Sequence, residues 1–95
     1  MGLRTCTIMV VEDHDFQRRT TLRLLKDLGA ESVLEAANGR EALGILTHRG
    51  EPLDIILCDL DMPEMDGVEF IRHVAEEQLA QAVIVVSAME ISILN

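Results

Sequence analysis

Four short apolar runs, separated by amphipathic segments, divide the chain. Three of the runs are apolar almost throughout instead of alternating with polar residues, which is typical of strands buried on both faces in a parallel sheet. The second run is short and includes Ser32 and Glu35. We predict strands over residues 7–11, 32–36, 53–58 and 82–86. Because helical segments lie between these runs, the pattern indicates an α/β fold with helices on both faces of the sheet.

The segment after the first strand is predicted to be a helix over about residues 16–28. Asp15 is expected to be its N-cap and Gly29 its stop, because these residue types favour the two ends of a helix. The inward face is expected at positions that share one side of the helix, namely Thr21, Leu24, Leu25 and Leu28.

Two further helices are predicted between the later strands. The second is expected to run from a cap at Asn38 to about residue 48, with Glu41 completing a capping box. The third is predicted over about residues 67–78, and the last residues, 90–95, are expected to begin another helix.

Polar residues stand where three of the predicted strands end. Glu12 and Asp13 follow the first strand, Asp59 follows the third and Ser87 follows the fourth. Ligands of open parallel sheets bind beyond the carboxyl ends of the strands, so these residues are the candidate site. His14 follows the acidic pair and could contact the loop that carries it, but we expect a solvated loop residue.

The chemistry of these residues suggests a cation and a phosphoryl group. Converging carboxylates repel one another, and Asp61 is a candidate fourth. Mg²⁺ relieves this repulsion, prefers oxygen ligands and leaves room for phosphate oxygens. One carboxylate is then able to form an acyl phosphate, while the Ser87 hydroxyl donates to a phosphoryl oxygen.

The composition narrows the possible partners. The chain has 95 residues, which allow one domain, and 48% of them are hydrophobic, enough for a core. The formal charge of -9 argues against direct nucleic-acid binding by this domain and against an anionic membrane surface. No apolar run suits a membrane span or a signal peptide, and Cys6 and Cys58 form no metal or disulfide motif. We therefore expect a cytoplasmic protein with reduced thiols.

A longer motif carries a specific family resemblance. Residues 55–67 read IILCDLDMPEMDG, and the fourth predicted strand ends in Ser87-Ala88. Together with Glu12-Asp13, these stretches resemble the receiver domain of two-component response regulators, and the resemblance covers essentially the whole chain. It implies a flavodoxin-like (CheY-like) doubly wound parallel sheet with strand order 2-1-3-4-5, and one receiver domain over residues 1–95.

The resemblance assigns a role to each site residue. Asp59 would be the phosphoacceptor, and Asp13 and Asp59 would ligate Mg²⁺ directly. The backbone carbonyl of Asp61 would be the third protein ligand, and Glu12 would hold the metal through water. Ser87 would be the switch hydroxyl.

A function follows from the resemblance as an expectation. The domain would accept a phosphoryl group from a histidine kinase or a phosphotransfer protein in a bacterial cytoplasm, and would act as a signalling switch instead of a turnover enzyme. The stretch Phe16-Gln17-Arg18 also faintly resembles receivers attached to cyclic di-GMP phosphodiesterase modules.

Two departures from the family pattern are visible. Receivers carry a lysine at the end of a fifth strand, but the chain's one lysine is Lys26, within the first predicted helix. We therefore expect the domain to stop before strand five and helix five, which leaves the fourth strand as an exposed edge and favours a homodimer or an exchange of elements. The second departure is the carboxylate of Asp61, which we expect to tune the lifetime of the acyl phosphate.

Two alternative functions remain open from the sequence. Asp59-Leu60-Asp61 also resembles the nucleophile motif of haloacid-dehalogenase-type phosphatases, although that motif usually lies on the first strand. The other alternative is a degenerate receiver that acts only through protein contacts. The intact acidic pair, Asp59 and Ser87 argue against such a loss of chemistry.

Overall fold

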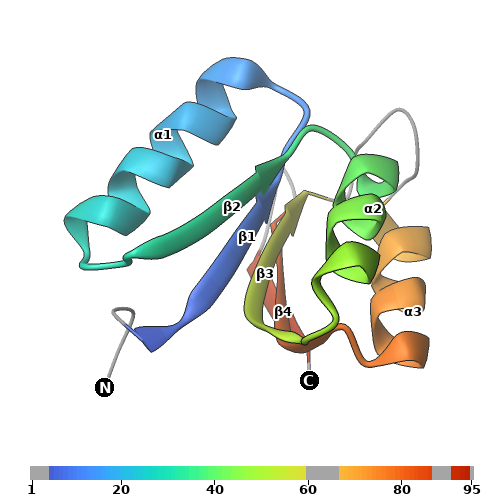
Figure 1. The fold of residues 1–95 in the computed structure, drawn as a ribbon. Coiled ribbons are helices and arrows are strands. Elements are labelled where there is room, and N and C mark those ends of the chain that lie inside the picture. The colour runs from blue at the N-terminus through green and yellow to red at the C-terminus, as the bar shows by residue number, and fades with distance from the viewer. Residues whose placement is uncertain (1–4, 60–66, 87–90, 95) are drawn as a thin grey trace.

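The computed structural model describes residues 5–59, 67–86 and 91–94, which form a sheet flanked by helices (Figure 1). In chain order the elements are β1 (Thr7–Val11), α1 (Asp15–Asp27), β2 (Ser32–Ala36), α2 (Gly39–Arg49), β3 (Leu53–Asp59), α3 (Gly67–Glu77), β4 (Ala80–Val86) and β5 (Ile91–Leu94).

The sheet has the order β2-β1-β3-β4-β5. The pairs β1–β2, β1–β3 and β3–β4 are parallel, as the sequence predicts for a flavodoxin-like fold. The first two strands have the predicted bounds, β3 continues one residue further to Asp59, and β4 begins two residues earlier at Ala80.

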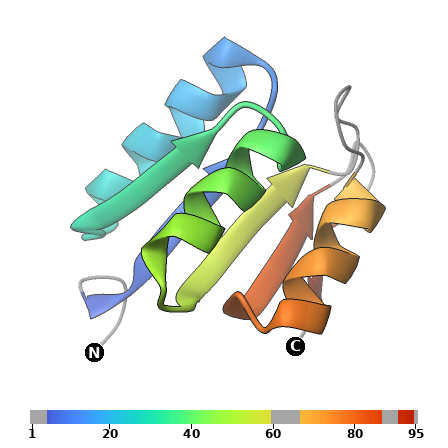
Figure 2. The same cartoon turned by 45° about the vertical axis from the view of Figure 1, so that its right-hand side comes forward.

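The two faces of the sheet are covered unequally. Figures 1 and 2 show α1 alone on one face, while α2 and α3 lie side by side on the other. None of the helices in the described part of the chain is long and apolar enough to span a lipid bilayer.

Alternate residues of each strand point to opposite faces and build two separate apolar clusters. On the side of α2 and α3, the larger cluster includes Met9, Ile56, Phe70 and Val74, all nearly inaccessible to solvent. On the side of α1, the smaller cluster consists of the buried residues Ile8, Val10, Leu25 and Ala30, with partly buried neighbours such as Leu22.

Helix α2 begins and ends as the sequence predicts. The Asn38 side chain accepts a hydrogen bond of 2.8 Å from the Glu41 backbone N–H, and the Glu41 side chain accepts one of 2.9 Å from the Ala37 N–H. Gly50 ends the helix with a φ of 79°, a left-handed conformation that glycine adopts without strain.

Helix α1 corrects two predictions. Its N-cap is His14, whose side chain makes no capping hydrogen bond, and Asp15 is the first helical residue instead of the cap. Of the four residues predicted to face inward, Leu25 is buried and Thr21 is half-buried, but Leu24 and Leu28 are 56% and 61% exposed. The reason is that the helix contacts the sheet through the stripe of Leu22 and Leu25.

The end of the chain corrects a third prediction. Residues 91–94 form strand β5 instead of a helix, and β5 pairs with β4 in antiparallel register, with Val83 opposite Leu94 and Val86 opposite Ile91. A short connection permits only an antiparallel neighbour, because a parallel one needs a long crossover. The backbone of β4 is thereby paired over Val83–Val86, so along these residues the outer edge of the sheet is β5 and not β4 as predicted.

Candidate functional site

The strand register brings the predicted site residues to the same edge of the sheet. Val11 at the end of β1 pairs with Cys58, so Glu12 and Asp13 leave the sheet beside Asp59, the last residue of β3. Asp59 in turn pairs with Val86, the last residue of β4. The convergence of the strand ends is therefore confirmed, whereas Asp61 and Ser87 lie outside the described residues.

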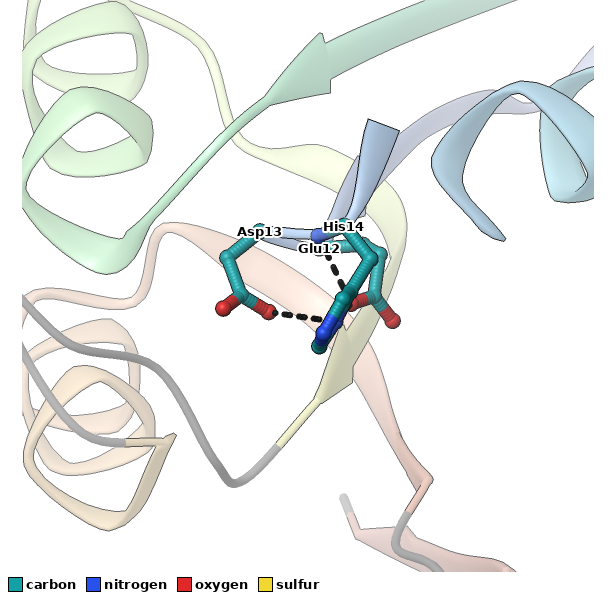
Figure 3. A group of neighbouring side chains, drawn as sticks. All are labelled: Glu12, Asp13 and His14. Carbon is teal, nitrogen blue, oxygen red and sulfur yellow. Dashed lines mark hydrogen bonds and ion pairs between the residues drawn. The ribbon is translucent and has the colours of Figure 1, made fainter. Parts of the chain in front are cut away.

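Glu12, Asp13 and His14 form a compact cluster in the turn between β1 and α1 (Figure 3). The His14 backbone N–H donates to Glu12 Oε2 over 3.1 Å, which folds the turn back on itself. His14 Nδ1 lies 3.2 Å from Glu12 Oε2 and 3.2 Å from Asp13 Oδ1. The imidazole is 67% exposed, as expected for a loop residue, yet it stands between the two carboxylates.

One carboxylate oxygen of this cluster accepts no hydrogen bond from the described residues. Asp13 Oδ1 is shielded from solvent and has no hydrogen-bond partner among the residues that the structure describes, since the nearby imidazole lies within ion-pair distance but outside hydrogen-bonding geometry. A shielded anionic oxygen is unfavourable unless a cation or a donor satisfies it. Together with the Glu12 carboxylate, it is a suitable oxygen donor for a hard divalent ion, so the residues present fit the Mg²⁺ that the sequence suggests.

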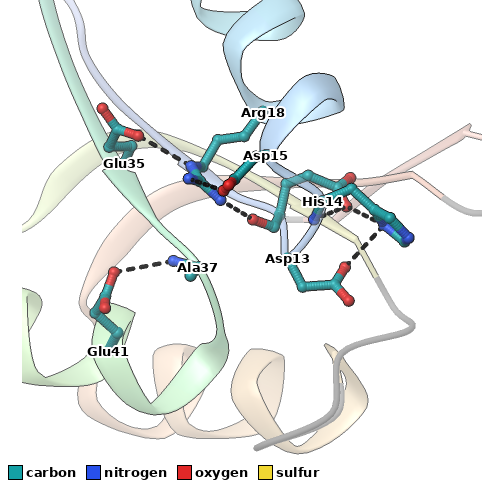
Figure 4. A network of polar contacts seen from close by, with 8 residues as sticks. Asp13, His14, Asp15, Arg18, Glu35, Ala37 and Glu41 are labelled. Atoms are coloured by element: carbon teal, nitrogen blue, oxygen red, sulfur yellow. Dashed lines mark hydrogen bonds and ion pairs between the residues drawn. The ribbon is translucent and has the colours of Figure 1, made fainter.

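Arg18 holds this turn in place from the first turns of α1 (Figure 4). Its guanidinium donates to the Glu12 backbone carbonyl over 2.9 Å, to Glu35 of β2 over 2.9 Å and to Asp15 over 2.6 Å. These bonds, first to Glu35 and then to Asp15, raise the pKa of Arg18 above its ordinary value. A second tie links the Glu12 N–H to the Ala36 carbonyl over 3.1 Å. The acidic turn is therefore fixed to the ends of both β1 and β2.

Sequence reasoning did not assign Arg18 to the site, and for His14 it favoured a solvated loop residue over contact with the metal loop. The Asp15–Arg18 pair has the i,i+3 spacing of a helical ion pair, which is a usable signal. The bonds from Arg18 to Glu35 and to a backbone carbonyl depend on tertiary structure. For His14, the only signal is its position directly after two acidic residues.

Comparison with known proteins identifies the same fold and the same kind of domain. The family model of the response regulator receiver domain matches residues 8–93. The chain is 41% identical over 83 residues to the cyclic di-GMP phosphodiesterase RocR of Pseudomonas aeruginosa, and 38% identical over 71 residues to a chemotaxis protein CheY homolog of Campylobacter jejuni. These alignments cover 87% and 75% of this chain.

A solved structure gives the same result. The receiver domain of the histidine kinase CKI1 from Arabidopsis thaliana, complexed with Mg²⁺ and BeF₃⁻, superimposes with a TM-score of 0.79 at 32% identity. The superposition covers 93% of this chain and 69% of that one.

The chain spans only part of the length of its sequence relatives. The sequence alignments cover 21% of RocR and 54% of the CheY homolog.

Proposed function

Because the chain belongs to the family of response regulator receiver domains, we propose that Asp59 is the residue that accepts the phosphoryl group. The observation that carries this proposal is the pairing of Val11 with Cys58, which places the acidic pair beside the end of β3. A carboxylate at a strand end, next to two further carboxylates and with a cation to balance them, is a competent nucleophile.

The transfer requires few groups from the protein. A carboxylate oxygen of Asp59 attacks the phosphorus of a phosphohistidine, a new P–O bond forms, the P–N bond breaks, and the imidazole leaves with the electron pair. Asp13, Asp59 and the backbone carbonyl of Asp61 would hold the metal, with Glu12 acting through water. When bound, Mg²⁺ offsets the negative charge of the phosphoryl oxygens. The Ser87 hydroxyl would donate to one of these oxygens and so respond to phosphorylation.

This chemistry defines the partners and the setting. The donor would be a sensor histidine kinase or a phosphotransfer protein in a bacterial cytoplasm, and each domain would be labelled once instead of turning over. The net charge of -9 supports this choice of partner, because an acidic surface favours basic protein patches over nucleic acid.

The test is the intact mass of the protein after incubation with acetyl phosphate and Mg²⁺. We expect one added phosphoryl group on the parent chain and none without Mg²⁺ or in Asp59→Asn. Asp54→Asn is the matched control, because Asp54 lies near the start of the same strand, where its side chain accepts a hydrogen bond of 2.8 Å from the Thr7 N–H. Labelling that persists in Asp59→Asn would contradict the assignment of the acceptor.

A turnover assay beside this labelling assay separates the alternative functions. Repeated hydrolysis of a phosphate ester, with Asp61 as general acid, is the signature of a haloacid-dehalogenase-type phosphatase, and the family match argues against it. A degenerate receiver would stay unlabelled in its full-length protein, even with an intact Glu12-Asp13 pair.

We also propose that this receiver controls a cyclic di-GMP phosphodiesterase activity. The support is the 41% identity to RocR over 87% of this chain, which includes the Phe16-Gln17-Arg18 stretch. In the full-length protein we expect cyclic di-GMP hydrolysis whose rate changes when beryllium fluoride occupies the receiver, and does not change in Asp59→Asn. Absence of hydrolysis by the full-length protein would contradict this narrower proposal and leave the receiver function intact.

A further inference from the structure

His14 adds a nitrogen donor to a site that otherwise offers oxygen. We propose that His14 Nδ1 is a metal ligand, and that the acidic turn therefore favours divalent ions such as Co²⁺ and Zn²⁺ over Mg²⁺. This inference rests on the proposed metal site, and it concerns only which ion that site prefers.

The distance between His14 Nδ1 and Asp13 Oδ1 matches that between neighbouring ligands of one metal. In an octahedral site with bonds of about 2.1 Å, adjacent ligand atoms lie roughly 3.0 Å apart. His14 Nδ1 is 3.2 Å from Asp13 Oδ1, the proposed direct ligand. It is also within hydrogen-bond distance, 3.2 Å, of Glu12 Oε2, which is proposed to act on the metal through water. One donor atom from each of the three residues lies within 4.8 Å of the others, and Figure 3 shows the three side chains directed to the same side of the turn.

The backbone keeps the imidazole in this position. His14 is the N-cap of α1, but its side chain does not cap the helix, and its own N–H donates to Glu12 Oε2. Arg18 fixes the preceding carbonyl, that of Glu12. The imidazole therefore extends from a turn that is hydrogen-bonded on both sides, so metal binding would require little rearrangement.

The donor set then determines the preference among ions. Imidazole nitrogen suits Zn²⁺, Co²⁺ and other first-row ions, whereas Mg²⁺ prefers oxygen and retains its water. A nitrogen ligand thus adds affinity for the first group and little for Mg²⁺. Asp13 Oδ1, shielded and without a hydrogen-bond partner in the described part of the chain, supplies a charged oxygen to either kind of ion.

The alternative role for the same geometry is an internal counter-ion. A protonated His14 would neutralise Glu12 and Asp13 and would compete with every cation. The two roles predict opposite effects when the imidazole is removed, because a ligand aids binding and a competing cation opposes it.

The experiment is calorimetric titration of the chain with Mg²⁺ and with Co²⁺ at about pH 8, where an ordinary imidazole is neutral. The variants are His14→Ala, Asp13→Asn and the control His48→Ala, whose imidazole lies on α2 beside the Gly44 carbonyl. We expect His14→Ala to weaken Co²⁺ binding by about tenfold or more and Mg²⁺ binding by no more than about twofold. His48→Ala should change neither.

A spectroscopic measurement complements the affinities. Zn²⁺ should shift the ¹⁵N resonance of His14 Nδ1 and leave those of His48 and His73 unchanged. Equal weakening of both ions in His14→Ala, tighter binding of both, or no change would each overturn the inference. If binding of every ion were also independent of Asp13, the proposed metal site itself would be wrong.

Discussion

The two faces of the sheet are stabilised in different ways. On one face, α2 and α3 enclose a large cluster that contains Phe70 and Val74, both almost fully buried. On the other face, α1 buries Leu25 and is held at its first turns by the polar contacts of Arg18. Most of the apolar stabilisation therefore lies on the face away from α1, whereas α1 contributes the contacts that position the acidic turn.

The largest expected effect is on the two-helix face. Phe70→Ala would remove a fully buried ring and should lower the free energy of unfolding by about 3–5 kcal/mol. For a domain of this size that loss is comparable to the whole stability. Urea unfolding followed by circular dichroism measures it, and a loss smaller than that of Leu25→Ala would contradict the comparison.

A large-to-small substitution on the α1 face should lower the free energy of unfolding less than Phe70→Ala does. Leu25→Ala is expected to lower the free energy of unfolding by about 2–3 kcal/mol, the low end for a buried leucine. The reason is that Leu25 belongs to the smaller cluster and retains slight exposure. The same urea titration gives the value, and equality with Phe70→Ala would show that both faces contribute alike.

A polar substitution tests how α1 is held. Arg18→Gln should lower the free energy of unfolding by about 1–2 kcal/mol, because bonds to the exposed carboxylates contribute little and the bond to the Glu12 carbonyl contributes more. It should also weaken Mg²⁺ binding by loosening the acidic turn. The neighbouring exposed residue gives the control, and Arg19→Gln should alter neither quantity.

The exposed leucines of α1 should have almost no effect. Leu24→Ser is expected to change the free energy of unfolding by no more than about 0.5 kcal/mol, since its side chain is 56% exposed. If Leu24→Ser lowered the free energy of unfolding as much as Leu25→Ala does, Leu24 would face the sheet, as the sequence predicts, and would not be exposed.

The smallest expected effect is weak self-association through the edge of β5. Light scattering should show a concentration-dependent increase in mass, because an outer strand offers unpaired backbone groups to a second chain. The double variant Leu24→Ser/Leu28→Ser should associate equally, which separates the edge from the exposed side of α1. A constant monomer mass at high concentration would contradict self-association through β5.

Most of the sheet was predictable because its strands are short and largely apolar runs between helical segments. The inward side of α1 was not, because Leu22–Leu25 and Leu24–Leu28 are both plausible stripes. The short Ile91–Leu94 segment carries too little periodicity to distinguish strand from helix, and only its pairing with β4 decides.

The candidate site was also predictable only in part. Strand ends identify Glu12, Asp13 and Asp59 from the sequence, because parallel strands bring their carboxyl ends together. The contact of Arg18 with Glu35 joins residues 17 positions apart, and no local pattern indicates it. Tertiary structure therefore determines how the acidic turn is supported, although the sequence identifies its acids.

Because α1 packs on the sheet through the smaller apolar cluster, it can detach without unfolding of the whole domain. Amide hydrogens in α1 should exchange with solvent through detachment of this helix alone, whereas those in α3 should exchange only when the whole domain unfolds. The acidic turn joins β1 to α1, so an ion bound there would have to be released before the helix could detach. Slower deuterium uptake along α1 after addition of the ion would then report that the acidic turn, at the N-terminal end of the helix, is occupied.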